Sequence, residues 1–256
     1  MRQSGLLVLS ALLAALLLSG CVSESGQSKR SVNTSDQMEA LLGLGAGYIR
    51  NREYGRAKEN LTKALAVDPN SAQAHNLFGL LFQLEGEPDL AEDYFRKAIR
   101  FDPKFSRARN NYGAFLFEQG RYNEAITQLQ ICAEDRLYGA RSQVFENLGV
   151  SYQRLGRVTE AEAAFVKSLQ LNQEQPRALL ELADIRFQQG SYAEANQLFQ
   201  RHDKLAQASP RSLWLGIQLA RIFKKADDEA SQALVLKNIF PMSKEYQLYQ
   251  DSNRKP

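Results

Sequence analysis

The chain has 256 residues, of which 44% are hydrophobic and 24% are charged, and its 32 Lys and Arg against 29 Asp and Glu leave a formal charge of +3. This composition is typical of a folded protein rather than a disordered one, and so small a positive excess argues against a nucleic-acid binder, which needs a concentrated basic face. With two Cys and two His, the sequence offers neither a disulfide framework nor an obvious metal site.

The first element in the chain is a short apolar segment. After a basic start, residues 6–18 are apolar apart from Ser10, and the segment ends in Leu18-Ser19-Gly20-Cys21. A positive start, a short apolar stretch and a small-residue exit predict a secretory signal peptide over residues 1–20. The ending resembles the lipobox of bacterial lipoproteins, which implies removal of residues 1–20 and a covalent lipid on Cys21, with no other cofactor. The alternative is an uncleaved N-terminal helix with a chance cysteine.

The residues that follow Cys21 indicate where such a lipoprotein would be held. Val22 stands where an Asp would resemble an inner-membrane retention signal, so the outer membrane is favoured, with the folded part in the periplasm. Residues 22–37 contain five serines and few apolar residues. We therefore expect residues 21–37 to comprise the lipidated cysteine and a flexible tether.

From residue 38 to 243 the sequence repeats with a period of about 34 residues. Glycines recur at 45, 79, 113 and 149, and alanines at 57, 91, 125, 161 and 195. In each period an apolar stripe at helical spacing, a turn and a second apolar stripe predict a pair of helices. The predicted units are 38–71, 72–105, 106–141, 142–175, 176–209 and 210–243, followed by a C-terminal tail at 244–256.

Glycine and proline mark the expected ends of these helices. Pro176 and Pro210 open units and suit a first helical turn, whereas Pro69 and Pro103 stop the second helices of their units. A glycine at the end of a first helix permits the positive φ of a helix terminus. Four glycines are expected in this role: Gly86, Gly120, Gly156 and Gly190.

The order and spacing of these columns resemble the tetratricopeptide repeat. The resemblance implies an all-α, right-handed superhelical solenoid of about six repeats and roughly twelve antiparallel helices, with a degenerate unit at the solvent-facing end. His75, His202 and Cys132 occupy columns that hold packing residues in other units, so we expect none of them to act as a ligand or nucleophile. Because the sequence also lacks phosphate-loop and nucleophile motifs, we do not expect an enzyme.

First helices line the concave groove of such a solenoid, so the residues around one recurring small residue in each first helix are candidates for partner binding. We call these small residues the small-residue column: Gly45, Gly79, Gly113, Gly149 and Ala183. With two edge arginines the candidates are Leu42, Ala46, Ile49, Asn76, Leu80, Gln83, Arg107, Asn110, Ala114, Phe117, Val150, Gln153, Arg154, Leu180 and Phe187; Glu146 and Asp184 occupy equivalent positions. The residues directly after the small column do not support the carboxylate clamp that some repeat proteins carry there. The groove suits an amphipathic helix or an extended apolar segment. Alternatively, Phe117 and Phe187 only pack between repeats.

Three further motifs narrow the resemblance. They are Asn110-Asn111-Tyr112-Gly113 with Phe115-Leu116, Trp214-Leu215-Gly216-Ile217 with Ala220-Arg221, and Leu236-Lys237-Asn238-x-Phe240-Pro241 with Ser243 and Glu245-Tyr246. With the lipobox and the repeat count, they resemble the type IV pilus biogenesis/stability lipoproteins, the PilF/PilW-type pilotins, over essentially the whole chain.

This resemblance implies an outer-membrane pilotin for pilus (fimbrium) biogenesis. Such a protein binds secretin subunits and promotes their localisation and multimerisation, while a lipid holds it to the membrane. We expect no nucleic acid and no small-molecule substrate. Two alternatives are a scaffold for another outer-membrane protein or a peptidoglycan synthase, and an enzyme or enzyme-activating subunit.

Overall fold

The structure, a computed structural model, describes residues 34–254. The expected signal peptide, the lipidation site at Cys21 and most of the expected tether therefore lie outside the described residues. The chain divides into two compact units, residues 1–40 and 41–256. The stacked repeats belong to the second unit.

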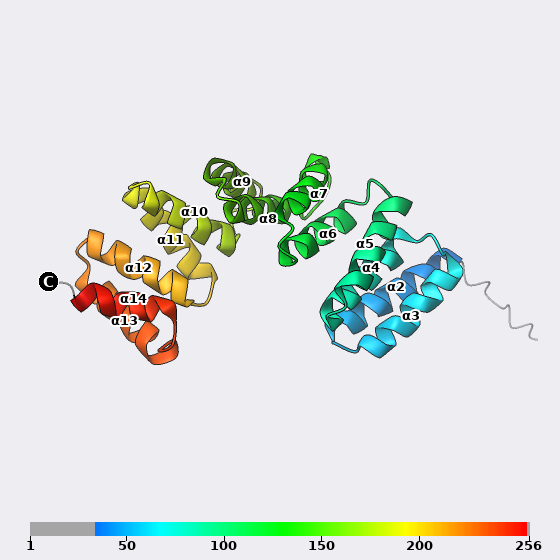
Figure 1. Ribbon diagram of the computed structural model, residues 1–256, viewed down its shortest axis with the longest axis horizontal. Coiled ribbons are helices and arrows are strands. Elements are labelled where there is room, and N and C mark those ends of the chain that lie inside the picture. Colours follow the sequence, from blue (N-terminus) through cyan, green and yellow to red (C-terminus); the bar gives the residue numbers. More distant parts are fainter. Residues whose placement is uncertain (1–33, 255–256) are drawn as a thin grey trace, which may run out of the picture. The chain divides into compact units, whose positions relative to one another are not determined.

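The described residues form thirteen α-helices and no strand, and the helices follow one another in pairs along the chain (Figure 1). From α4 to α13, the two helices of each pair pack together, and each second helix packs against the first helix of the next pair. The expected all-α solenoid is thereby confirmed. The helices are α2 (Thr34–Arg50), α3 (Tyr54–Val67), α4 (Ala72–Glu85), α5 (Pro88–Phe101), α6 (Ser106–Glu118), α7 (Tyr122–Glu134), α8 (Arg141–Arg154), α9 (Val158–Leu171), α10 (Pro176–Gln188), α11 (Tyr192–Leu205), α12 (Pro210–Ile222), α13 (Ala226–Ile239) and α14 (Lys244–Arg254).

Glycine and proline act at the helix ends as the sequence predicts. Pro176 and Pro210 each occupy the first turn of a helix, where the missing N–H costs nothing. Gly86 ends α4 with a φ of 79°, a left-handed conformation that glycine adopts without steric cost. The other three turn glycines, Gly120, Gly156 and Gly190, also have positive φ.

The small-residue column sets how closely the two helices of a pair approach. A Cβ built on Gly79 would lie 2.6 Å from the Phe95 ring, and one built on Gly149 would lie 2.5 Å from the Phe165 ring. Both rings are fully buried. Because interiors are close-packed, these rings fill the space that a side chain at the glycine would need.

In α7, α9 and α11, a side chain of the second helix contacts the start of the first helix of its own pair. Cys132, Ser168 and His202 contact the backbone carbonyl oxygens 26 residues earlier, at 3.1, 2.9 and 2.9 Å respectively: those of Ser106, Ser142 and Pro176. Each of these three side chains thus has a hydrogen-bond partner within its own repeat, although Nε2 of His202 is buried without one.

The segment expected as a C-terminal tail forms an additional helix. α14 packs on α12 and α13, and its Tyr246 and Tyr249 join an apolar cluster that includes Ile217 and Leu236. The polar sequence of this segment gave no indication of a helix, and in the structure none of its residues is buried. Contacts with the last repeat, rather than a strong apolar stripe, account for its position.

At the other end, α2 starts before the expected end of the tether. Thr34, Ser35, Asp36 and Gln37, the last four residues of that segment, are helical. Asp36 in the first turn supplies the negative charge that stabilises a helix N-terminus. Because residues 22–37 are rich in serine, their sequence does not indicate the start of a helix.

Candidate functional site

The predicted groove residues lie on α2, α4, α6, α8 and α10, the first helices of five pairs, and we refer to this surface as the first-helix face. The structure separates these candidates by exposure. Leu42, Asn76, Asn110, Val150 and Leu180 are buried. Ala46, Ile49, Leu80, Gln83, Ala114, Phe117, Gln153 and Phe187 are half-buried, and Arg107 and Arg154 are exposed.

Buried amides connect successive first helices. Asn111 Nδ2 donates to Asn76 Oδ1 at 2.9 Å between α6 and α4, and Asn147 Nδ2 donates to Asn110 Oδ1 at 3.2 Å between α8 and α6. Asn76 is only 2% exposed. These amides fix the register of neighbouring repeats, and a partner on this face would meet mainly the residues around them.

The two candidate phenylalanines pack against other side chains and are also partly exposed. Phe117 contacts Tyr122 with ring centroids 5.3 Å apart, and Phe187 contacts Tyr192 at 5.2 Å. Both rings pack against the buried core, yet each is only half-buried. The Arg154 guanidinium lies 5.9 Å from the centroid of the Phe117 ring, so it covers part of that ring.

A cavity of about 270 Å³ lies on the first-helix face where α8, α10 and α12 meet, and it is lined by Val150, Gln153, Arg154, Arg177, Glu181 and Arg211. The structure thus brings together three predicted residues with three that sequence reasoning missed. One signal could have found two of the missing residues, because Arg177 and Arg211 each follow the proline that opens their helix, 34 residues apart.

Arg211 is fixed by two carboxylates of α10. Its Nη1 and Nη2 donate to Glu181 Oε1 and Oε2 at 2.6 and 2.8 Å, and Nη2 also donates to Asp184 Oδ2 at 2.7 Å. Gln153 Nε2 donates to Glu181 Oε2 at 2.9 Å. Burial raises the pKa of Glu181, but the Arg211 guanidinium and the Gln153 amide outweigh it, so the pKa lies below its ordinary value and the carboxyl is ionised.

Glu146 is a second buried carboxyl beside this cavity. It is 8% exposed on α8, and burial raises its pKa above the ordinary value although the Arg177 charge and the Ala178 N–H oppose the shift. Glu146 is therefore less readily ionised than Glu181.

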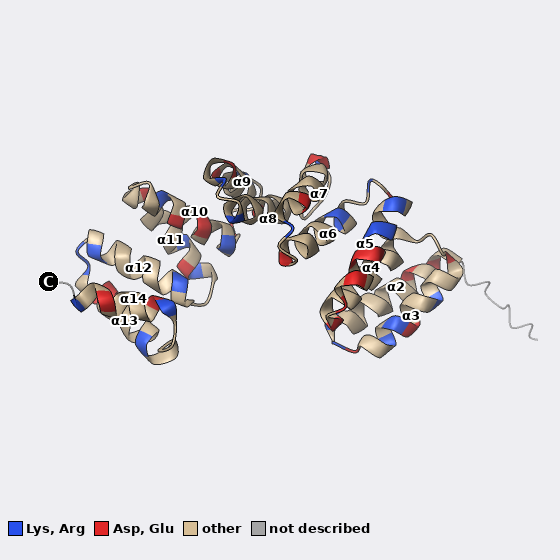
Figure 2. Cartoon of the chain, viewed as in Figure 1, with Lys and Arg blue, Asp and Glu red and all other residues tan. Residues whose placement is uncertain are grey.

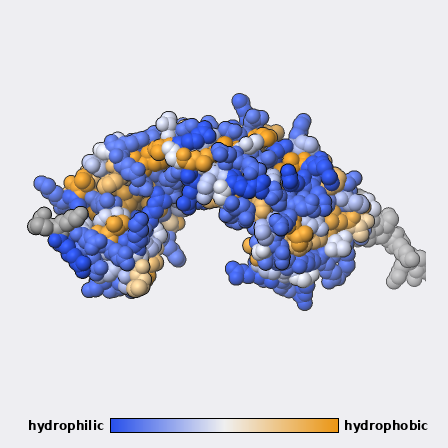
Figure 3. Space-filling view, in the orientation of Figure 1, coloured by the Kyte–Doolittle hydropathy of each residue, from blue (hydrophilic) through white to orange (hydrophobic). Residues whose placement is uncertain are grey.

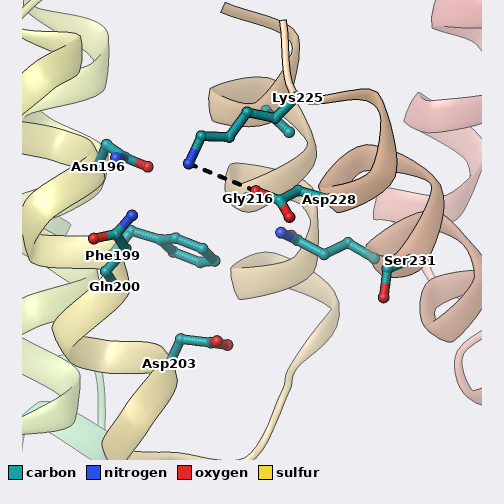
Figure 4. A pocket seen from close by; sticks show the side chains of 10 residues that line it. Asn196, Phe199, Gln200, Asp203, Gly216, Lys225, Asp228 and Ser231 are labelled. Atoms are coloured by element: carbon teal, nitrogen blue, oxygen red, sulfur yellow. Dashed lines mark ion pairs between the residues drawn. The ribbon is translucent and has the colours of Figure 1, made fainter. Parts of the chain in front are cut away.

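A further cavity of about 280 Å³ lies among α11, α12 and α13 (Figure 4). Phe199 and Asp203 approach from α11, and Lys225 and Asp228, an ion pair at 3.7 Å, lie at the start of α13. Because Gly216 has no side chain, the Gln232 amide can lie against it; a Cβ at Gly216 would overlap that amide.

The remaining candidates for chemistry have structural contacts. His75 Nε2 lies 2.9 Å from Pro69 O, and its ring stacks on Phe101. Burial raises the pKa of the Cys132 thiol to about 11. In residues 34–254, no cluster of His, Cys, Asp and Glu has the arrangement of a metal site. No helix in the same range is both long and apolar enough to span a bilayer.

The surface is mixed in charge and hydropathy. Acidic and basic residues are interspersed along the helices (Figure 2), and the face shown in Figure 3 has hydrophobic patches separated by hydrophilic residues. Recognition on such a surface depends on local groups rather than on one extended charged field.

Comparisons with known proteins agree with the repeat architecture and indicate a smaller group of proteins within the repeat family. Tetratricopeptide-repeat family models match residues 42–104, 147–210 and 105–174. The type IV pilus assembly protein PilF of Pseudomonas aeruginosa is 41% identical over 240 residues, which cover 93% of this chain and 95% of that protein. An uncharacterized protein of Haemophilus influenzae is 29% identical over 140 residues, or 55% of this chain and 76% of that protein.

Two solved structures extend the similarity to three dimensions. A structure of Pseudomonas aeruginosa PilF superposes with a TM-score of 0.84 at 41% identity, covering 86% of this chain and 99% of that chain. PilW, described as a widely conserved type IV pilus biogenesis factor, superposes with a TM-score of 0.71 at 25% identity, covering 83% and 98%. The chain therefore belongs to the tetratricopeptide-repeat family, within the group of type IV pilus biogenesis proteins that resemble PilF.

Proposed function

We propose that this protein is an outer-membrane lipoprotein, a pilotin, that binds subunits of the type IV pilus secretin and promotes their localisation and multimerisation. The similarity to the pilus assembly protein PilF over nearly the full length of both chains carries the proposal. The sequence around Cys21 supports the lipid anchor, and Val22 supports the outer membrane.

In this proposal the fold divides the work between an anchor and a binding surface. Acyl chains on Cys21, at about 0.8 kcal/mol per buried CH₂, hold the protein to the bilayer. The first-helix face binds a secretin segment and covers its apolar residues before the subunits assemble. Tetratricopeptide-repeat proteins mediate protein–protein interaction and are typically not enzymes, which agrees with a binding role.

Matched substitutions on the two kinds of helix test the binding surface. Ala114 is half-buried on α6 of the first-helix face, and Ala163 is exposed on α9, a second helix. Affinity capture from solubilised membranes should recover the secretin with the wild-type lipoprotein and with Ala163→Asp, but not with Ala114→Asp. A negative charge on the first-helix face would be buried without a partner when an apolar segment docks.

Two outcomes would contradict parts of the proposal. Failure of the wild-type lipoprotein to capture any secretin would overturn the pilotin function. Equal capture of the secretin by Ala114→Asp and Ala163→Asp, with both variants folded by circular dichroism, would show that the first-helix face is not the binding surface.

A further inference from the structure

An open cavity of about 640 Å³ lies where α7, α8 and α9 meet (Figure 1). The predicted groove residues of the first-helix face all lie outside it. Its walls are three apolar side chains of α8 and three alanines of the neighbouring second helices, with polar groups beside them. The lining residues are Gln130, Ala133, Glu134, Phe145, Leu148, Tyr152, Glu160, Ala163 and Ala164.

A tyrosine ring fills the corresponding space between α4 and α5. Tyr94 of α5 stacks on Phe78 and Phe82 of α4, with ring centroids 4.8 and 5.4 Å apart, and its centroid lies 5.6 Å from that of the His75 ring. Aromatic rings at such separations attract one another. Tyr94 therefore shows which kind of group the walls of this space hold.

The pair formed by α8 and α9 keeps such walls but lacks the ring. Phe145, Leu148 and Tyr152 precede Ala164 by 19, 16 and 12 residues, the same intervals that separate the three wall rings of α4 from Tyr94. Ala164 thus stands at the position of Tyr94. Because protein interiors are otherwise close-packed, an alanine in place of a tyrosine accounts for the cavity.

An alanine at this position is a property of one repeat. The other five helix pairs from α2 to α13 carry larger side chains there: Asn60, Tyr94, Gln128, Leu198 and Gln232. In the next pair, Leu198 fills the position and is 7% exposed. The cavity is therefore a local feature of α8 and α9 and not a general consequence of the repeat fold.

A lysine stands in position to cover a ring in this cavity. In α5, Lys97 follows Tyr94 by three residues, and its Nζ lies 4.9 Å from the centroid of the Tyr94 ring. Lys167 follows Ala164 by three residues in α9. Its Nζ donates to Gln170 at 3.4 Å and forms no ion pair in residues 34–254. A cation over an aromatic face attracts the ring, an interaction that an aliphatic side chain lacks.

Charge around the cavity does not select an ion. Glu134 and Glu160 line it, whereas Arg141 and Arg157 each cover one of its rings. Both signs of charge thus surround the cavity, and its floor is apolar. A neutral aromatic ring fits these surroundings better than a charged group does.

The ring must come from another protein. Residues 1–33 contain no aromatic residue. Among the aromatic side chains of residues 34–254, the most exposed are Tyr192 and Phe223, at 36% and 38%, and Tyr192 packs against Phe187. Neither projects freely from the surface, so a second copy of this chain offers no suitable ring.

We infer that the cavity between α7, α8 and α9 binds one aromatic side chain of a partner protein, with the ring against Phe145, Leu148 and Tyr152 and beneath Lys167. The ring would lie as Tyr94 lies in its own repeat. The inference goes beyond the proposed function, because it requires neither the secretin nor the first-helix face. A pilotin that binds secretin on the first-helix face keeps this cavity open for a second protein.

Disulfide capture of small compounds tests the cavity without the partner. Ala163 lines the cavity and is exposed, so Ala163→Cys in the full lipoprotein places a thiol at its rim. Cys132 is buried and does not compete. The protein, held in lipid nanodiscs, is equilibrated with the cystamine bis-amide of either 3-phenylpropanoic acid or 4-methylpentanoic acid at increasing 2-mercaptoethanol. Intact-protein mass spectrometry measures the labelled fraction.

The phenyl label should withstand about threefold more 2-mercaptoethanol than the aliphatic label, or a larger excess, because only the phenyl group gains the aromatic and cation contacts. Equal resistance of the two labels would overturn the inference. Gln197→Cys is the matched control, since Gln197 is the equivalent exposed residue one repeat later, where Leu198 fills the space. A phenyl preference of the same size at Gln197→Cys would also overturn it.

Two further substitutions locate the bound ring. Ala163→Cys combined with Ala164→Tyr should show no phenyl preference, because the new ring occupies the cavity as Tyr94 does in its repeat. Ala163→Cys combined with Lys167→Gln should show a reduced preference and keeps the decision open to experiment if the tyrosine variant does not fold. A preference that either folded double variant leaves unchanged would contradict the proposed position of the ring.

Sedimentation of the detergent-solubilised lipoprotein tests a second copy as the occupant. Wild type and Ala164→Tyr should have the same molecular mass. A wild-type dimer that Ala164→Tyr disrupts would show that a second copy fills the cavity and would overturn a separate partner. Neither experiment contains secretin, so their failure leaves the pilotin function intact, and failure of secretin capture leaves this inference intact.

Discussion

At the scale of single residues, the glycine of the repeat column works by having no side chain. Gly79→Ala would place a Cβ 2.6 Å from the fully buried ring of Phe95. We expect it to lower the free energy of unfolding by about 1–3 kcal/mol, the usual cost of overpacking. Gly43 has nothing within 4 Å of a built Cβ, so Gly43→Ala should instead stabilise α2 by about 0.5–1 kcal/mol.

Thermal unfolding followed by circular dichroism at 222 nm measures both effects. Both substitutions replace glycine by alanine and so raise helix propensity equally. Opposite changes in melting temperature would therefore come from the packing around each position. A melting temperature for Gly79→Ala at or above that of the wild type would contradict the packing argument.

Sequence reasoning succeeded where one residue decides its local structure. Gly86 and Pro210 act within their own turns, so their helix boundaries were predictable. Arg211 was missed because its partners Glu181 and Asp184 lie 30 and 27 positions away, and Arg177 because the stacking of repeats brings its charge near Glu146 of the preceding unit. Only the stacking of repeats brings such residues together, and local periodicity does not predict side-chain pairing.

At the scale of helices, the Glu181–Arg211 pair joins α10 to α12. Because the folded-state pKa of Glu181 lies below its ordinary value of 4.5, the pair contributes stability above that pH, and this contribution is lost as the pH falls through the folded-state pKa. Arg211→Gln should destabilise the protein by about 1–3 kcal/mol at neutral pH, a range kept low because the Arg211 side chain is 42% exposed.

Melting temperatures of the wild type and Arg211→Gln across the pH range check this prediction. The difference between them should be largest near neutral pH and shrink as the pH falls through the lowered folded-state pKa of Glu181, below which Glu181 is protonated in both proteins. Arg136→Gln, which removes an exposed arginine from the turn between α7 and α8, serves as the charge-matched control. A difference that stays constant down to acidic pH would show that Arg211 acts through packing rather than through its charge.

One arginine contributes several of the contacts that dock α14 on the last repeat. Arg221 of α12 donates to Ser252 Oγ at 2.8 Å and to Asn253 Oδ1 at 2.7 Å, and its guanidinium lies 5.5 Å from the Tyr249 ring centroid. Since no residue of α14 is buried, these contacts carry much of its attachment. Arg221→Ala should accelerate amide hydrogen exchange in residues 244–254 about tenfold or more, the effect of losing roughly 1.4 kcal/mol.

Exchange in α4 to α9 should be unchanged in that variant, because the repeats of a solenoid contact mainly their neighbours. Arg254→Ala, which removes an exposed arginine of α14 itself, is the control. Unaltered protection of residues 244–254 in Arg221→Ala would mean that the two tyrosines alone hold the helix.

At the scale of the whole molecule, the two cysteines distinguish a lipidated protein from an unmodified one. Cys132 is 1% exposed with a pKa raised by burial to about 11, so its thiol should not react with a thiol reagent at neutral pH while the protein is folded. With Cys21 acylated, the protein purified from membranes should show no reactive thiol when folded and one after denaturation. Two thiols after denaturation would contradict lipidation at Cys21.

The most direct test of the proposed function is the amount of secretin multimer in the outer-membrane fraction of cells that produce the wild-type protein, the Cys21→Ser variant or no protein. We predict abundant multimer with the wild type, and little in the outer membrane with the variant, although the variant remains folded and binds secretin subunits. Equal amounts of multimer in the outer membranes of all three strains would contradict a lipid-anchored protein that localises and assembles the secretin.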